Sequence, residues 1–260
     1  MHPDEGGGRR WPFATFPTTE WTVVVAAGEE AGARQKPNAT REAEAALDRL
    51  YTRYRTPILV HLTRQGHSPE DAEDLAQSFL REKLIQADFL KGRSEDKGRF
   101  RTWVLRSLEN FVRDQRRNAN AKKRGGGARM EPLDPVTGTV PSGRGMPGGA
   151  ISPQEAFDLS LANTLVANVF GRLKEEYAQK GKTGWFDLFE PLLYDDSEAL
   201  SYRDIAARIG TTESGARSAA SRARGRLRFL IRDEVARIVA DPALIEDEMR
   251  HLMEALRRRG

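Results

Sequence analysis

A stretch rich in glycine and proline divides this chain of 260 residues and most constrains what it can fold into. Residues 125–153 contain eight glycines and five prolines and show no hydrophobic periodicity. Glycine permits many backbone conformations and proline removes a hydrogen-bond donor, so we expect a flexible linker here. The chain is therefore expected to form two small domains, one on each side of the linker.

Apolar residues recur at helical spacing on both sides of this linker. In the first segment, Leu47, Leu50, Tyr51 and Tyr54 are three or four residues apart. This spacing places apolar side chains on one face of a helix that packs against a core. No segment shows the sustained alternation of a β-strand, so the sequence predicts an all-α fold.

Capping motifs indicate where helices begin. A serine cap is followed by an acid three residues later in segments 68–71 and 201–204, and the first also has proline at the first helical position. Asp241-Pro242 marks a third start. The predicted organisation is an N-terminal extension (1–39), a first domain (40–124), the linker (125–153), a second domain (154–240) and a C-terminal helical extension (241–260). Within the N-terminal extension, residues 16–25 are either a short helix that docks through Trp21 and Val24 or a disordered tail.

The amino-acid composition indicates the cellular compartment in which the protein is expected. The chain has no cysteine, which excludes disulfides and thiolate metal sites and favours a reducing cytoplasm. It lacks an apolar run of the roughly 20 residues that a membrane helix needs. The first residues have no apolar signal core, so we expect neither export nor a membrane segment.

Residues 201–232 have the pattern of a helix-turn-helix. A short helix over 204–209 ends at Gly210, where a left-handed residue is expected, and Thr212 can cap a second helix. The second helix has small residues on its inner face, which lets two helices cross closely. These residues are Ala216, Ala219, Ala220 and Ala223, followed by Leu227.

The outer face of that second helix is strongly basic. Residues 201–232 hold eight arginines and two acids, and arginine can bond a guanine edge through two hydrogen bonds. The simpler interpretation is a helical hairpin with a solvated basic face. The candidate duplex-DNA contacts are Thr212, Arg217, Ser218, Ser221, Arg222, Arg224 and Arg228.

A second basic segment lies at the C-terminal end of the first predicted domain. Residues 99–129 hold ten lysines or arginines and two acids, and several share one helical stripe. Cations there can follow a phosphate backbone, and an amide among them can contact an unstacked base. The stripe also includes Trp103, which we interpret as partly buried. The candidate contacts are Arg99, Arg106, Asn110, Arg113, Arg117, Lys122, Lys123 and Arg124.

The helix that begins at Ser68 has the opposite charge at its start. Acids there complement the helix dipole, and the polar face continues beyond the first turn, which favours a protein partner. That face comprises Asp71, Asp74, Gln77, Ser78 and Arg81. A metal or acid–base site is disfavoured because the four histidines are scattered, so we expect no catalytic residue, metal or cofactor.

At this point the ordered motifs resemble a known family. Segment 68–77 resembles the start of region 2.2 of bacterial RNA polymerase sigma factors, segment 100–124 resembles regions 2.3 and 2.4, and segment 201–228 resembles region 4.2. Their order and spacing are similar to those of the extracytoplasmic-function group, which lacks a folded region 3. The opening at 16–21, the basic and glycine-rich segment 123–127 and Asp241-Pro242 are similar to one subgroup.

The resemblance implies roles for the candidate residues. The face around Asp74 would bind the clamp coiled coil of the β′ subunit, and the Arg99–Arg124 segment would hold the melted −10 element. The helix-turn-helix would bind the −35 element as duplex while its domain contacts the flap of the β subunit. The chain would be a promoter-recognition subunit and not an enzyme, and a regulator that holds it inactive is a further expected partner.

Three other interpretations stay open at this point. A conventional helix-turn-helix regulator would dimerise on a palindrome and would not melt DNA. A recombinase or nuclease would use Asp71 and Asp74 with a metal, but the absence of a third well-placed acid or a histidine nearby counts against this interpretation. A structural helical adaptor would have no need of two separate basic faces.

Overall fold

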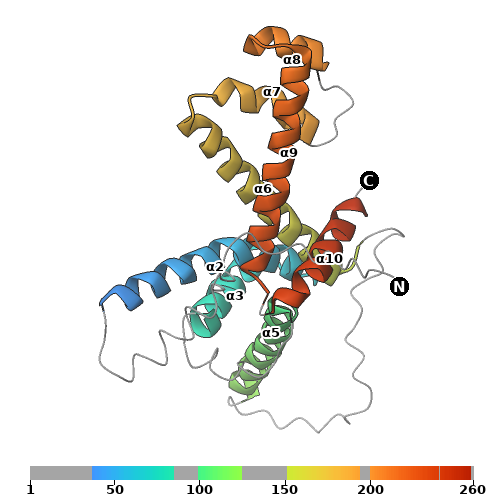
Figure 1. Ribbon diagram of the computed structural model, residues 1–260. Helices are drawn as coiled ribbons and strands as arrows, with labels where there is room; N and C mark the ends of the chain where they lie inside the picture. The colour runs from blue at the N-terminus through green and yellow to red at the C-terminus, as the bar shows by residue number, and fades with distance from the viewer. Residues whose placement is uncertain (1–36, 85–98, 125–150, 194–199, 240, 259–260) are drawn as a thin grey trace, which may run out of the picture.

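The computed structural model describes residues 37–84, 99–124, 151–193, 200–239 and 241–258 of the chain (Figure 1). All secondary structure in these ranges is helical, which confirms the predicted all-α fold. The N-terminal elements are α2 (Pro37–Arg64), α3 (Pro69–Phe79), a π-helical turn η1 (Leu80–Leu84) and α5 (Phe100–Arg124). The C-terminal elements are α6 (Pro153–Gln179), α7 (Thr183–Leu193), α8 (Tyr202–Ile209), α9 (Glu213–Ala236), a 3-10 turn η2 (Pro242–Leu244) and α10 (Ile245–Arg257).

The predicted caps lie at the starts of their helices. Ser68 and Ser201 accept hydrogen bonds from backbone amides three residues on, so each satisfies a donor that the first helical turn leaves without a partner. Asp241 caps the 3-10 turn that leads into α10. Ser152, which the sequence analysis did not single out, forms a full capping box with Glu155 at the start of α6.

The largest core is shared between the two halves of the chain. We call residues 37–124 the N-terminal half and residues 151–258 the C-terminal half. Helix α2 packs along α6, and one continuous apolar cluster joins α2, α3 and α5 to α6, the end of α9 and α10. Tyr54 of α2 stacks near Phe157 of α6 with ring centroids 6.4 Å apart. Two smaller clusters lie along α6, α7, α8 and α9.

Helix α9 connects the two ends of the molecule. In Figure 1 it runs from its contact with α8 at the top to the region where α2, α6 and α10 meet, and α5 extends away below. The predicted linker lies outside the described residues as far as residue 150, and the N-terminal extension lies outside them as far as residue 36. The division into separate domains therefore stays a prediction, as does the role of segment 16–25.

Candidate nucleic-acid interface

A tight turn joins α8 to α9. Gly210 ends α8 with φ of 69°, a left-handed conformation that favours glycine because a Cβ atom would be strained there. Thr212 then caps α9 by accepting a hydrogen bond from the Gly215 amide at 3.1 Å. A helix, a tight turn and a second helix therefore follow one another in the expected order. Gly210 ends the first helix, and Thr212 accepts a backbone hydrogen bond at the start of the second.

Small side chains set the contact between α8 and α9. Ala216, Ala219, Ala220 and Ala223 are all buried, as the sequence predicted, and they pack with Ile205 and other residues of α8. Because alanine ends at Cβ, the two backbones can approach closely without leaving a void. The polar face of α9 is consequently turned away from the core.

Most of the predicted duplex-contact residues lie on that exposed face. Arg217 donates to Glu213 at 2.7 Å, and its guanidinium lies 4.9 Å from the centre of the Tyr202 ring. These contacts hold Arg217 near the start of α9 while leaving it exposed. The exposed members of the predicted set are Thr212, Arg217, Ser218, Ser221, Arg222 and Arg228.

Arg224 is placed differently from the other arginines of this set. It is half-buried and donates to the Tyr202 hydroxyl at 3.1 Å and to the Leu192 carbonyl at 3.3 Å. These bonds tie α9 to α8 and α7. Arg224 therefore supports the helix pair, and Arg222 beside it is the more exposed candidate for a DNA contact.

The stripe on α5 is divided between an exposed part and an enclosed part. Arg106, Asn110, Arg113 and Arg117 are exposed, and Asn110 accepts a hydrogen bond from Arg113 at 3.3 Å through its side-chain oxygen. The helix extends to Arg124, but the side chains of residues 121–124, including Lys122 and Lys123, lie outside the described part of the structure.

The first turn of the stripe is half-buried and contacts other residues of the protein. Trp103 is partly buried and stacks on Phe100 with ring centroids 5.3 Å apart, in line with its interpretation as partly buried. Arg99 forms an ion pair with Glu248 of α10 at 3.2 Å. The structure therefore brings Arg99 to α10 and leaves the distal stripe open to solvent.

The predicted partner face on α3 is also exposed. Asp71, Asp74, Gln77 and Arg81 face solvent, while Ser78 is half-buried. Glu73, which lies between them in sequence, is engaged by Gln77 and by Arg55 of α2 at 2.9 and 2.6 Å. These hydrogen bonds lower the pKa of the Glu73 carboxyl below its ordinary value. Asp74 is consequently the more open acid on this face.

A groove of about 380 Å³ separates α3 from the middle of α5. Asp71, Asp74 and Ser78 line one wall, and Gln115 and Arg116 of α5 line the other. His67 approaches Arg116 at 3.2 Å. Partial burial, followed by the charge of Arg116, lowers the pKa of His67. The predicted partner face thus continues onto the element that carries the cationic stripe.

Buried charges are the feature that the sequence analysis missed. Arg53, Arg101, Asp158, Glu234 and Glu248 are buried and joined in ion pairs. A signal was present in α10, because Glu248 stands three residues after Ile245 and four before Leu252, on the apolar face. Its partner Arg101 lies 147 residues away in sequence, so no local pattern could have paired them.

Comparison with known proteins adds no family to these observations. No protein-family model, curated protein or solved structure matches the chain. Within the described ranges, no helix has the length and apolar character needed to span a bilayer. The same ranges bring together no group of three or more histidine or acidic side chains that could hold a metal ion.

Proposed function

We propose that this protein is a bacterial RNA polymerase sigma factor of the extracytoplasmic-function type. The observation that carries the proposal is that one chain presents two exposed cationic helix faces, on α9 and on α5, and a third, acidic face on α3. A duplex-binding regulator uses one such face per subunit. A protein that binds duplex DNA, a melted strand and a polymerase needs three.

The two cationic faces are suited to different forms of DNA. The α9 face combines exposed arginines with exposed serines near the start of the helix, an arrangement suited to the major groove of duplex DNA. The α5 face places Asn110 among arginines, and an amide offers both a donor and an acceptor to a base edge. A separated strand exposes such edges, while the arginines neutralise its phosphates.

In this proposal the protein carries out no bond chemistry. The face around Asp74 binds the β′ clamp of core polymerase, α9 binds the −35 duplex, and the exposed stripe of α5 holds one strand of the −10 element. Unstacking each base step costs roughly a few kcal/mol, and the contacts made by the stripe offset that cost. The protein is cytoplasmic in this proposal, because its partners are polymerase and promoter DNA.

Strand opening is the property that tests the proposal. Core polymerase with the wild-type protein should make thymines around −10 reactive to permanganate on a promoter from a genomic library. Asn110→Ala should leave closed-complex binding nearly normal and reduce this reactivity about tenfold, as expected when one base contact worth about 1–3 kcal/mol is lost. Asn118→Ala, at an exposed position of α5 outside the stripe, is the matched control.

The polymerase face has its own test. Asp74→Arg combined with Gln77→Ala should weaken assembly with core polymerase in native mass spectrometry and leave the circular-dichroism spectrum unchanged. Glu82→Arg, at an exposed position just after α3, should assemble normally. If the wild-type protein occupies promoters but produces no reactive thymine at any of them, the sigma-factor proposal fails and a dimeric helix-turn-helix regulator replaces it.

A further inference from the structure

Arg217 is held by two neighbours at the start of α9. Its Nε and Nη2 atoms donate to one oxygen of Glu213, at 3.2 and 2.7 Å. A second contact comes from α8, where the Tyr202 ring has its centre 4.9 Å from the guanidinium. A free arginine samples many rotamers, so two such contacts restrict its orientation. The side chain nevertheless stays 62 % exposed, which leaves it open to a ligand.

Tyr202 is fixed in turn by another arginine of α9. Arg224 donates to the Tyr202 hydroxyl at 3.1 Å and to the Leu192 carbonyl at 3.3 Å. Tyr202 thus contacts one arginine through its hydroxyl and another through its ring. Helices α7, α8 and α9 therefore act together in positioning Arg217.

Gly215 lets the turn lie close against the first turn of α9. A Cβ atom at this position would lie 2.5 Å from the Thr211 hydroxyl and 3.3 Å from the Thr212 hydroxyl. Only glycine leaves room for this approach. The end of α8 and the start of α9 are thereby kept in a fixed relation, which the contact of Tyr202 with Arg217 requires.

The bonds to Glu213 leave one edge of the Arg217 guanidinium open. A guanidinium carries five N–H donors in one plane, one on Nε and two on each terminal nitrogen. Glu213 takes the edge formed by Nε and Nη2. Within the part of the chain that the structure describes, no partner engages the Nη1 atom. The edge formed by Nη1 and Nη2 can donate two parallel hydrogen bonds to O6 and N7 of a guanine.

An acid at this place needs a reason. Residues 201–232 contain two acids, and Asp204 is the other one, which accepts from the Ser201 hydroxyl at the start of α8. A carboxylate beside duplex DNA repels the phosphates. The exposed pair between Glu213 and Arg217 also adds little to stability. Orientation of Arg217 is a benefit that offsets the unfavourable charge.

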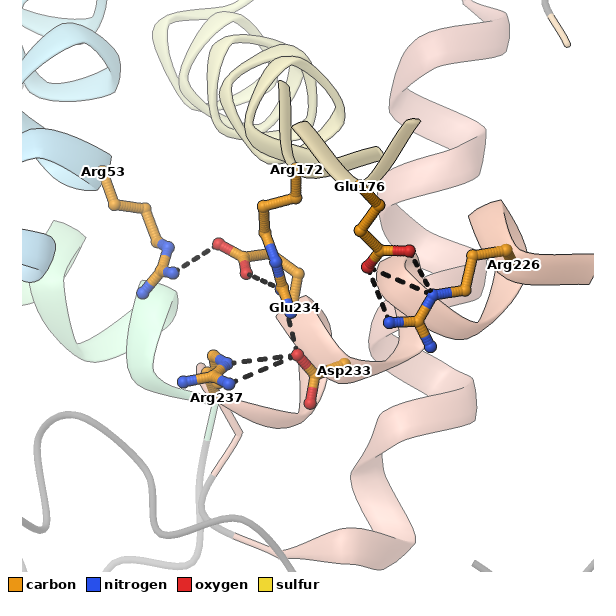
Figure 2. A network of polar contacts seen from close by, with 7 residues as sticks. All are labelled: Arg53, Arg172, Glu176, Arg226, Asp233, Glu234 and Arg237. Carbon is orange, nitrogen blue, oxygen red and sulfur yellow. Dashed lines mark hydrogen bonds and ion pairs between the residues drawn. The ribbon is translucent and has the colours of Figure 1, made fainter. Parts of the chain in front are cut away.

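Arg226 of α9 shows the contrasting arrangement. Figure 2 shows it directed toward Glu176 of α6, whose two oxygens accept its hydrogen bonds at distances between 2.7 and 3.2 Å. That pair joins two helices and so supports the fold. Glu213 and Arg217 belong to one helix and join no separate elements. Their contact is therefore available for binding.

We propose that Glu213 and Tyr202 are positioning residues that set Arg217 to read a guanine in the duplex bound by α9. This inference rests on the duplex-binding role of α9 in the function proposed above. It assigns the base at one position of the −35 element, a guanine opposite the first turn of α9. Arg217 makes both hydrogen bonds to that base, and the two positioning residues act through Arg217.

Selection from a randomised duplex library supplies the probe. The full-length protein, alone and together with core polymerase, selects its preferred sequence, and each base pair of that sequence is then replaced in turn. Relative affinities are measured by competition fluorescence anisotropy. The wild type should prefer guanine at one position by about tenfold or more. Arg217→Lys should lose this preference and keep its affinity for unrelated duplexes, because lysine retains the charge but not the planar fork.

Variants of the positioning residues provide the decisive measurement. Glu213→Ala should reduce the guanine preference to about threefold or less, while affinity for unrelated duplexes stays equal or rises because a negative charge is lost. Tyr202→Leu should reduce the preference similarly, and Tyr202→Phe should retain it because the ring remains. Glu254→Ala, at an exposed position of α10, removes the same charge elsewhere and is the matched control. Circular dichroism checks that each variant keeps its helices.

The outcomes separate this inference from the function on which it rests. A guanine preference that survives both Glu213→Ala and Tyr202→Leu overturns the positioning role and leaves duplex binding intact. Failure to enrich any sequence, with or without polymerase, overturns the inference and the role of α9 together. If the preference depends on Glu213 but no promoter shows strand opening, the inference stands for a duplex-binding regulator and the sigma-factor function fails.

Discussion

Arginine serves different purposes in two regions of the molecule: the buried ion pairs between the N-terminal and C-terminal halves, and the exposed face of α9. In the buried ion pairs, Arg53 contacts one carboxylate and Arg101 contacts two, all from the other half of the chain. On α9, Arg222 and Arg228 are exposed above a core of alanines. Arginine suits both settings because it stays charged and presents five donors in a planar fork. An arginine-rich sequence is therefore not by itself a DNA-binding surface, and the packing around each side chain decides its role.

The largest expected effect is the loss of stability when Arg101, in the buried ion pairs, is replaced. Arg101→Ala leaves the carboxylates of Asp158 and Glu248 buried without their shared partner. The free energy of unfolding should fall by about 3–5 kcal/mol. Urea denaturation followed by circular dichroism measures this loss. Arg106→Ala, at an exposed position of the same helix, should change stability by no more than about 0.5 kcal/mol, and equal losses in both variants would refute the contrast.

A smaller effect is expected in the alanine core beneath the exposed arginines. Ala220 is 1 % exposed at the contact of α9 with α8, so Ala220→Leu adds volume where none is available. Overpacking should destabilise the protein by about 1–3 kcal/mol and weaken binding to a −35 duplex, because it moves α9 against α8. Ala207→Leu, at an exposed position of α8, is the control. Comparable thermal stability of the two variants would show that the close crossing is unimportant.

Substitutions of Arg222 and Arg224, two residues apart on α9, should have different effects. One should weaken DNA binding, and the other should lower the stability of the fold. Arg222→Ala should weaken −35 duplex binding about tenfold, roughly 1.4 kcal/mol, with no loss of stability. Arg224→Ala should lower the free energy of unfolding by about 1 kcal/mol, because it removes bonds to Tyr202 and Leu192. Fluorescence anisotropy and urea denaturation of both variants provide the two measurements. Equal losses of stability in the two variants would contradict the assignment of Arg224 to the helix pair and of Arg222 to DNA binding.

The smallest expected effect is a pH dependence at the interface of the halves. His61 of α2 is buried against Phe157 of α6, and this burial lowers the pKa of His61 from its ordinary value of 6.5. As the pH falls through 6.5, the unfolded chain binds the proton before the folded protein does. The free energy of unfolding therefore decreases toward acid pH.

His61→Asn removes this contribution. Between pH 7.5 and 6.0 one histidine can lower stability by at most about 0.8 kcal/mol. The wild type should lose more stability than His61→Asn over that range in paired urea titrations. His67, whose pKa is also lowered, is present in both proteins and cancels in the comparison. Parallel pH profiles would show that His61 is not enclosed at this interface.

Local features of the fold could be predicted because their causes lie within a few residues. The cap at Ser68, the left-handed turn at Gly210 and the buried Ala216 follow from hydrogen bonding, backbone freedom and helical periodicity. The box formed by Ser152 and Glu155 could also have been predicted, since its serine and glutamate have the required spacing. Because the predicted linker extended through residue 153, no helix start was expected at Ser152.

The candidate site was predictable in part for the same reason. The exposed face of α9 and the distal stripe of α5 are each carried by one helix, so spacing alone identifies the residues. The positions of Arg99 and Arg224 could not be predicted in this way. Their partners, Glu248 and Leu192, come from other helices, and nothing in the local pattern distinguishes these arginines from their exposed neighbours.

The sequence by itself determined the all-α class, several helix starts and the faces that each helix divides between core and solvent. Those properties depend on interactions between residues at most a few positions apart. Tertiary structure alone decided that α2 lies along α6, and that Arg101 meets Asp158 and Glu248. A buried charge requires a partner, but the free energy of the pair depends on distance and burial, which only the packing of distant helices sets.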